Sequence, residues 1–148
     1  FHSRLSAKAK HYSYSIWIGK HSPVFERKYT FRCTETLDIQ AMRQAAAAFI
    51  GTHDFKSFCQ TGAQVESTVR TIYSVEVEEQ GENDLVIRVC GNGFLYNMVR
   101  IIAGTLLDIG QGKRDPMDIF TILESKDRSA AGPTAPAHGL TLVKYEFL

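Results

Sequence analysis

The predicted order of elements along this chain, βαββααβ, indicates an α+β protein with a ferredoxin-like plait. In that fold, helices pack on one face of an antiparallel sheet. Two observations predict it. Segments with the alternating pattern of strands are separated by segments with the 3.6-residue period of helices. In addition, a length of 148 residues, 44% hydrophobic and 22% charged, fits one globular domain over residues 1–148.

Alternation of side chains defines the predicted strands. In the first strand, Tyr12, Tyr14 and Ile16 share one face and are aromatic or β-branched, as strand residues commonly are. A short second segment is expected to extend the pairing of this strand. A polar, glycine-containing turn separates the third and fourth segments and predicts a hairpin. The expected strands cover residues 11–18, 27–33, 69–79, 85–90 and 140–147.

Capping residues place the predicted helices. Asp38 caps the first helix, and Gly51 suits its end. Asn92 is the candidate N-cap of the second helix. Asp115 caps the third helix, with Pro116 at its first position. The helices are expected over residues 38–50, over residues 94–109 and from residue 115 onward, and residues 129–139 are expected to form a loop.

The second helix has an unusual outer face. Its core face is apolar and consists of Phe94, Leu95, Met98, Ile101, Ile102, Thr105, Leu106 and Ile109. Arg100 points the other way, and its helical neighbours are aromatic, amide or small: Tyr96, Asn97, Ala103, Gly104 and Leu107. Small residues let another backbone or a ligand come close. We therefore expect Arg100 to face a partner, and a guanidinium favours an anionic one.

Basic residues gather at the start of the chain. Residues 1–32 contain seven lysines and arginines against one glutamate, although the net charge of the whole chain is only +1. One interpretation is a local patch for an anion such as a phosphate backbone. The other is a solvated edge strand protected by lysines. Charge alone leaves both open.

The remaining composition argues against several classes of protein. The three cysteines match no zinc or redox spacing, and the five histidines do not pair at metal-ligand spacing, so we expect no metal site. The simplest interpretation of the three cysteines is that they are reduced thiols in a cytoplasmic protein. No apolar run is long enough to cross a membrane, and we expect no signal peptide.

Three stretches together resemble the tRNA pseudouridine synthase A family. They are FHSRLSAKAKHYSY, GNGFLYNMVRIIAGTLLDIGQGK and SKDRSAAGPTAPAHGL, in the order and with roughly the spacing of the family. The resemblance covers the whole chain and matches the C-terminal domain of the family, itself an α/β plait. It implies an isomerase that converts uridine to pseudouridine in the anticodon stem-loop of tRNA. It implies no cofactor, and it implies a homodimer.

The resemblance also implies that part of the active site lies elsewhere. The family's catalytic aspartate belongs to a Gly-Arg-Thr-Asp motif in the preceding domain, and this sequence contains no such motif. Because the chain begins at Phe1 rather than Met, we expect an excerpt of a longer protein, without its N-terminal domain. On this interpretation the chain alone is inactive, and it needs that domain as a partner.

The family pattern gives roles to individual residues. Tyr12 matches the tyrosine that packs on the target uracil, and Arg100 matches the basic residue that pairs with the catalytic aspartate. Arg4 matches a position near the RNA entrance. Lys8 and Lys10 lie close to Tyr12 in the sequence, which favours contact with RNA phosphates over plain solvation.

Arg128 is a further candidate for RNA binding. A local salt bridge to Asp127 or Glu124 is the alternative for this side chain. Two other functions also stay open at this point. A non-enzymatic RNA-binding plait would bind tRNA as strongly as any longer form. A metabolite-binding or dimerisation module would have no salt-dependent affinity for RNA.

Overall fold

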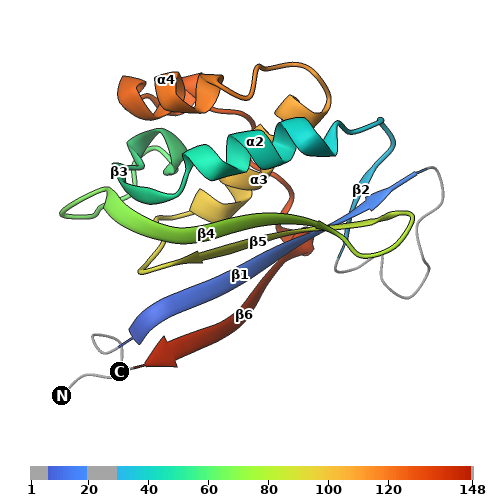
Figure 1. The fold of residues 1–148 in the computed structure, drawn as a ribbon. Helices are drawn as coiled ribbons and strands as arrows, with labels where there is room; N and C mark the ends of the chain where they lie inside the picture. Colours follow the sequence, from blue (N-terminus) through green and yellow to red (C-terminus); the bar gives the residue numbers. More distant parts are fainter. Residues whose placement is uncertain (1–6, 20–29, 148) are drawn as a thin grey trace.

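The computed structural model describes residues 7–19 and 30–147. The elements in chain order are β1 (Ala7–Ile18), β2 (Phe31–Cys33), α2 (Ile39–Ala48), β3 (Gly51–Asp54), β4 (Val69–Glu79), β5 (Asp84–Gly91), α3 (Met98–Gly110), α4 (Asp118–Ser125) and β6 (Leu140–Phe147). Short 3-10 turns occur at η1 (Lys56–Phe58), η2 (Arg128–Ala130) and η3 (Ala137–Gly139). Figure 1 shows the helices on one face of the sheet. The predicted α+β plait is confirmed.

The first strand is the centre of the sheet. The pairing order is β2-β1-β5-β4-β3, and β6 also pairs with β1. Along one edge β1 pairs antiparallel with β5, and along the other it pairs with β6 and then, near its end, with β2. The pairing with β2 is parallel, so the prediction of a purely antiparallel sheet was wrong at this one strand.

A short strand after the first helix was not predicted. The helix ends at Ala48, and Gly51 begins β3, which pairs antiparallel with β4. Gly51 has a φ of +112°, which glycine adopts readily and other residues rarely do. The chain therefore reverses at Gly51 into a four-residue edge strand, too short to show an alternating pattern.

The second predicted helix begins later than expected. Asn92 is not its N-cap, because the Asn92 backbone N–H donates to the Thr71 carbonyl oxygen and the Asn92 side chain accepts from the Thr71 N–H. Both bonds continue the pairing between β4 and β5. The helix starts at Met98, directly after Asn97, whose left-handed backbone has a φ of +60°. Phe94 and the residues up to Asn97 form the turn that leads into it.

The third predicted helix also begins later, at Asp118 rather than Asp115. The Asp115 carboxylate accepts a hydrogen bond of 2.8 Å from the Met117 N–H, so it caps a turn that precedes the helix. In return, the Asp118 carboxylate accepts from the Asp115 N–H at 3.1 Å. Two carboxylates that each accept from a nearby backbone N–H thus hold this turn in place.

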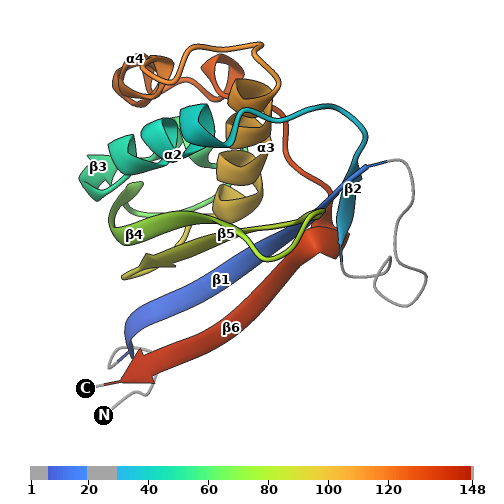
Figure 2. The same ribbon diagram turned by 45° about the vertical axis from the view of Figure 1, so that its right-hand side comes forward.

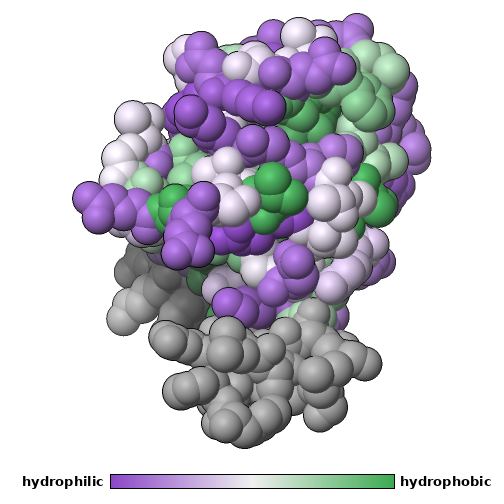
Figure 3. All heavy atoms as spheres, turned by 90° about the vertical axis from the view of Figure 1, so that its left-hand side faces the viewer, coloured by the Kyte–Doolittle hydropathy of each residue, from purple (hydrophilic) through white to green (hydrophobic). Residues whose placement is uncertain are grey.

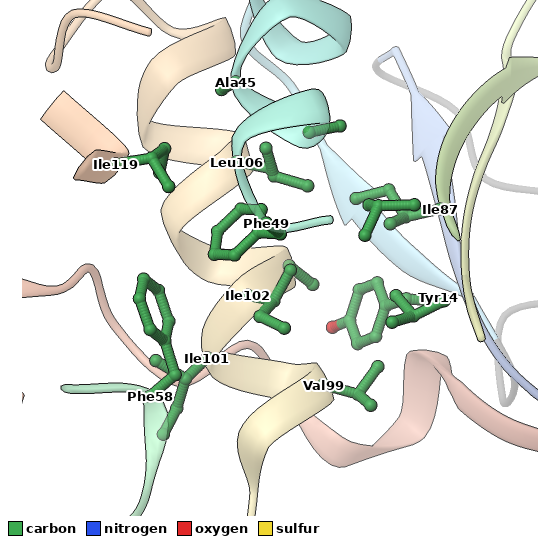
Figure 4. Packing of buried hydrophobic residues seen from close by; sticks show 14 of the residues in the cluster. Tyr14, Ala45, Phe49, Phe58, Ile87, Val99, Ile101, Ile102, Leu106 and Ile119 are labelled. Atoms are coloured by element: carbon green, nitrogen blue, oxygen red, sulfur yellow. The ribbon is translucent and has the colours of Figure 1, made fainter. Parts of the chain in front are cut away.

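The core lies between the sheet and the helices. Helices α2 and α3 pack on one face of the sheet, and α4 lies farther from it (Figures 1 and 2). Figure 4 shows Tyr14 and Ile87 of the sheet facing Ile102 and Leu106 of α3, with Phe49 after α2 completing the layer. Helix α3 is buried on almost every side, which indicates that it also packs against something on the face away from the sheet.

Candidate functional site

The segment 131–135 covers the outer face of α3. A Cβ atom on Gly104 would lie only 1.8 Å from the Pro133 carbonyl oxygen. The Ala135 N–H donates to the Arg100 carbonyl oxygen at 3.0 Å, and the Gly132 N–H donates to the Thr105 hydroxyl at 2.9 Å. The expectation that small residues on this face admit another backbone is therefore confirmed, and that backbone comes from the predicted loop over residues 129–139.

Two hydrogen bonds orient the half-buried Arg100 side chain. Its Nε donates to the Ala135 carbonyl oxygen at 2.8 Å, and its Nη1 donates to the Asn97 side-chain oxygen at 3.0 Å. These partners are neutral. No salt bridge to Arg100 is found within residues 7–19 and 30–147. A fixed guanidinium with only neutral acceptors keeps its full charge available for an anion.

Tyr12 and Arg100 line the same cavity. Tyr12 is half-buried on β1, and its ring meets Phe94 edge-on, with ring centroids 5.2 Å apart and planes at 88°. The cavity measures about 220 Å³, and it is also lined by the turn before α3 and by Leu140 at the start of β6. We call it the Tyr12–Arg100 cavity. It combines aromatic rings, which can hold a flat ligand, with one oriented cation.

Tyr14 packs beneath this cavity, a role that was not predicted from the sequence. Its hydroxyl donates to the Pro136 carbonyl oxygen at 2.7 Å, and its ring is fully buried beside α3 (Figure 4). Burial raises the pKa of the Tyr14 hydroxyl above its ordinary value, and the charge of Arg100 offsets part of that rise. A signal was available, since alternation places Tyr14 on the same strand face as Tyr12.

Comparison with known proteins shows to which family this chain belongs. The family model described as tRNA pseudouridine synthase matches residues 45–147, well over half of the chain. The chain belongs to the tRNA pseudouridine synthase family.

Curated relatives carry the same name. The chain is 52% identical to the tRNA pseudouridine synthase A of Anoxybacillus flavithermus over 142 residues, which cover 96% of this chain and 57% of that protein. It is 53% identical to the protein of the same name from Geobacillus kaustophilus, over 99% of this chain and 57% of the relative. The chain is also 52% identical to the Bacillus subtilis protein of this name, over 96% of this chain. It thus spans little more than half of the length of these synthases.

The structure describes only some of the other residues that were predicted to bind RNA. Arg4 lies outside the described residues, and Lys8 belongs to β1 but its side chain is not among those described. Lys10 is half-buried on β1, where it is paired with Gly91 of β5. The predicted roles of these three residues in RNA binding stay predictions.

Arg128 does not form the salt bridge that was weighed as an alternative. Its guanidinium donates to the Gly132 carbonyl oxygen at 2.8 Å and to the Thr134 hydroxyl at 3.1 Å. Asp127 instead accepts from the N–H and the hydroxyl of Ser129, and these hydrogen bonds hold the pKa of its carboxyl below the ordinary value. Arg128 therefore shapes the loop that covers α3, and its predicted contact with RNA is untested.

The described part of the chain contains neither a candidate metal site nor a membrane-spanning helix. No group of three or more His, Cys, Asp or Glu residues there could hold a metal ion. Nor is any helix within residues 7–19 and 30–147 both long and apolar enough to cross a membrane.

Proposed function

We propose that this chain completes the active site and binds the substrate in a synthase that converts uridine to pseudouridine in the anticodon stem-loop of tRNA. The observation that supports it best is the Tyr12–Arg100 cavity. The resemblance gave roles to these two residues separately, and the fold brings them to one cavity although they are far apart in the chain. The preceding domain would supply the catalytic aspartate, because this sequence has no Gly-Arg-Thr-Asp motif.

The chemistry fits residues of these types. The reaction breaks the bond between C1′ of the ribose and N1 of uracil and forms one between C1′ and C5; C5 loses a proton, and N1 gains one. A base stacked in a helix cannot turn in this way, so the nucleotide must be flipped into a cavity. An aromatic ring such as that of Tyr12 can hold the detached base, since base–aromatic stacking contributes about 1–3 kcal/mol.

Arg100 would act on the carboxylate of the missing aspartate. A carboxylate must be ionised to act as a nucleophile or base, and an arginine beside it lowers its pKa by about 1–3 units. The hydrogen bonds that the guanidinium donates to the Ala135 carbonyl oxygen and to the Asn97 side-chain oxygen hold it in place before the aspartate arrives. Such preorganisation reduces the rearrangement needed on reaction.

Replacing Arg100 in the whole synthase tests this proposal. We expect Arg100→Ala to lower the turnover of unmodified tRNA by about a hundredfold or more, with little change in Kd for tRNA. Turnover is measured as tritium released from C5-labelled uridine. Arg100→Lys keeps the charge and should keep part of the activity. Arg43→Ala is the matched control, because Arg43 is exposed on α2 and lies outside the cavity lining. Weaker tRNA binding with unchanged turnover would contradict the pairing role.

Three further expectations belong to the whole protein. It would form a homodimer, work in the cytoplasm and contact tRNA phosphates through Arg4, Lys8 and Lys10. The basic start of the chain supports the last of these. If the whole protein binds tRNA but never releases tritium, a non-enzymatic RNA-binding plait explains the chain better. If it has no salt-dependent affinity for RNA, a metabolite-binding or dimerisation module does.

A further inference from the structure

A second hollow lies beside the Tyr12–Arg100 cavity. It measures about 500 Å³ and lies between the segment that follows β3 and the segment that follows α4. Its lining includes three cationic side chains, Lys56, Lys126 and Arg128, against one carboxylate, Asp127. We call it the Lys56–Lys126 hollow. An excess of positive charge in a concave site concentrates anions there.

Buried hydrogen bonds fix the walls of this hollow. The Ser57 hydroxyl donates to the Ile122 carbonyl oxygen at 2.7 Å and accepts from the Asp127 N–H at 2.9 Å, which ties the two segments together. Lys126 has a left-handed backbone with a φ of +52°, and this lets the chain turn back after α4. These hydrogen bonds thus hold together the two segments that line the hollow.

The charges in the hollow are not equally available. Arg128 already donates to the Gly132 carbonyl oxygen and the Thr134 hydroxyl. Asp127 accepts from Ser129 within its own turn. Lys56 and Lys126 are both exposed, and no hydrogen bond or ion pair of their ammonium groups is found in the described part of the chain. The two lysines are thus the groups that an incoming anion would meet.

The hollow and the Tyr12–Arg100 cavity share a wall. Gln60 lines the hollow; its N–H donates to the Tyr96 carbonyl oxygen at 3.1 Å, and its side chain accepts from the Asn97 amide. Tyr96 and Asn97 also line the Tyr12–Arg100 cavity. Figure 3 faces the end of the molecule at which β3 and α4 lie, and there hydrophilic residues cover most of the surface between separate apolar spots. A polar ligand could therefore extend across both sites.

We propose that the Lys56–Lys126 hollow binds a backbone phosphate of the same RNA strand whose flipped nucleotide enters the Tyr12–Arg100 cavity. This inference rests on the proposed function. Lysine binds phosphate as a point charge, and phosphate contacts position a nucleic acid without reading its sequence. Lys56 and Lys126 supply the charge, and Arg128 acts as a positioning residue that builds the wall behind them.

The salt dependence of tRNA binding tests this in the whole synthase. Each phosphate neutralised on a single strand contributes about 0.7 to the slope of log K against log salt concentration. We expect the double variant with Lys56→Gln and Lys126→Gln to lose about 0.7 of that slope and to raise KM with kcat unchanged. Lys113→Gln is the matched control, because Lys113 is also exposed but lies after α3 and lines neither site. An unchanged slope in the double variant would overturn the proposal.

A second measurement identifies the ligand. Inorganic phosphate should shift the amide resonances of residues 61–63 in the wild-type protein and not in the double variant. Shifts of this kind together with an unchanged salt slope would mean that the hollow takes free phosphate, and would overturn the assignment to RNA. Failure of this site is distinguishable from failure of the proposed function. In the first case the wild type isomerises uridine and the double variant matches it, whereas in the second the wild type does not isomerise uridine.

Discussion

At Gly104 another segment of the backbone occupies the place where a side chain would be. The Pro133 carbonyl oxygen would lie 1.8 Å from a Cβ atom there, and the Pro133 carbonyl carbon 2.8 Å away. Both are backbone atoms of the loop whose Ala135 carbonyl oxygen holds Arg100. A glycine in the middle of a helix costs about 1 kcal/mol relative to alanine. Glycine is nevertheless required at position 104, because the backbone of the loop lies where a Cβ atom would be.

Gly104→Ala is therefore expected to destabilise the protein although alanine favours helix. The gain in helix propensity is about 1 kcal/mol. Overpacking typically costs about 1–3 kcal/mol, and a clash with backbone at 1.8 Å belongs at or above the upper end. Urea unfolding should thus show a net loss of about 2 kcal/mol or more. Gly81→Ala, where the nearest atom lies 3.8 Å away, is the control and should change little. Equal stability of the two variants would contradict the close approach.

At the scale of elements, Tyr14 joins the central strand to the loop that closes the site. Its hydroxyl reaches the Pro136 carbonyl oxygen, and Gly139 packs so closely on its ring that a Cβ would lie 2.7 Å from Cζ. The buried ring and the hydrogen bond together place the loop that supplies Ala135 to Arg100. Strand β1 thus contributes twice to the site, through Tyr12 in the cavity and Tyr14 beneath it.

Tyr14→Phe tests this connection through its dependence on pH. At pH 7 the variant should be about 1 kcal/mol less stable, because it loses one hydrogen bond. Burial raises the pKa of Tyr14 in the folded protein above 10.0, so the wild type gradually loses this stabilisation above pH 10. By pH 11 the wild type should have lost about 1.4 kcal/mol relative to the variant, so that the variant becomes slightly the more stable of the two. Denaturant unfolding at both pH values measures it. A difference that does not change with pH would contradict a hydroxyl that stays protonated in the fold.

The sequence pattern predicted the helices and strands whose bounds depend on the residues within them. Residues 69–79 alternate because one face of that strand is buried, and the strands over residues 69–79 and 140–147 both have the predicted bounds. The start of α3 was missed because Asn92 is held by Thr71, a partner on another strand. Strand β3 was missed because four residues carry no period. Tertiary contacts decide such boundaries, and a single sequence does not display them.

At the scale of the whole molecule, the candidate site is assembled from segments that are distant in the sequence. The outer face of α3 predicted that Arg100 faces a partner, because a lone arginine among small residues is unusual on a solvated helix. It did not show that the loop over residues 131–135 is the part of this chain that lies there. The Lys56–Lys126 hollow was not predictable at all. Its two lysines are ordinary exposed charges until the fold places their segments side by side.

The division of the site between chain segments leads to the last prediction. Arg100 has only neutral partners in the described part of the chain, and the sequence contains no Gly-Arg-Thr-Asp motif. On the proposed function, the 148-residue chain would hold the base and contact the RNA but would lack the carboxylate that attacks. We expect it to bind unmodified tRNA with an affinity that falls as salt rises, and to release no tritium from labelled uridine.

The control for this prediction is the whole synthase, assayed with the same tRNA at the same concentration of binding sites. Circular dichroism of the chain alone confirms that any lack of turnover is not a lack of folding. Measurable release by this chain would mean that one of its own carboxylates is the nucleophile, and would remove the reason for pairing Arg100 with a second domain. Binding without release would instead support the proposal that this chain recognises the RNA and that the preceding domain supplies the attacking carboxylate.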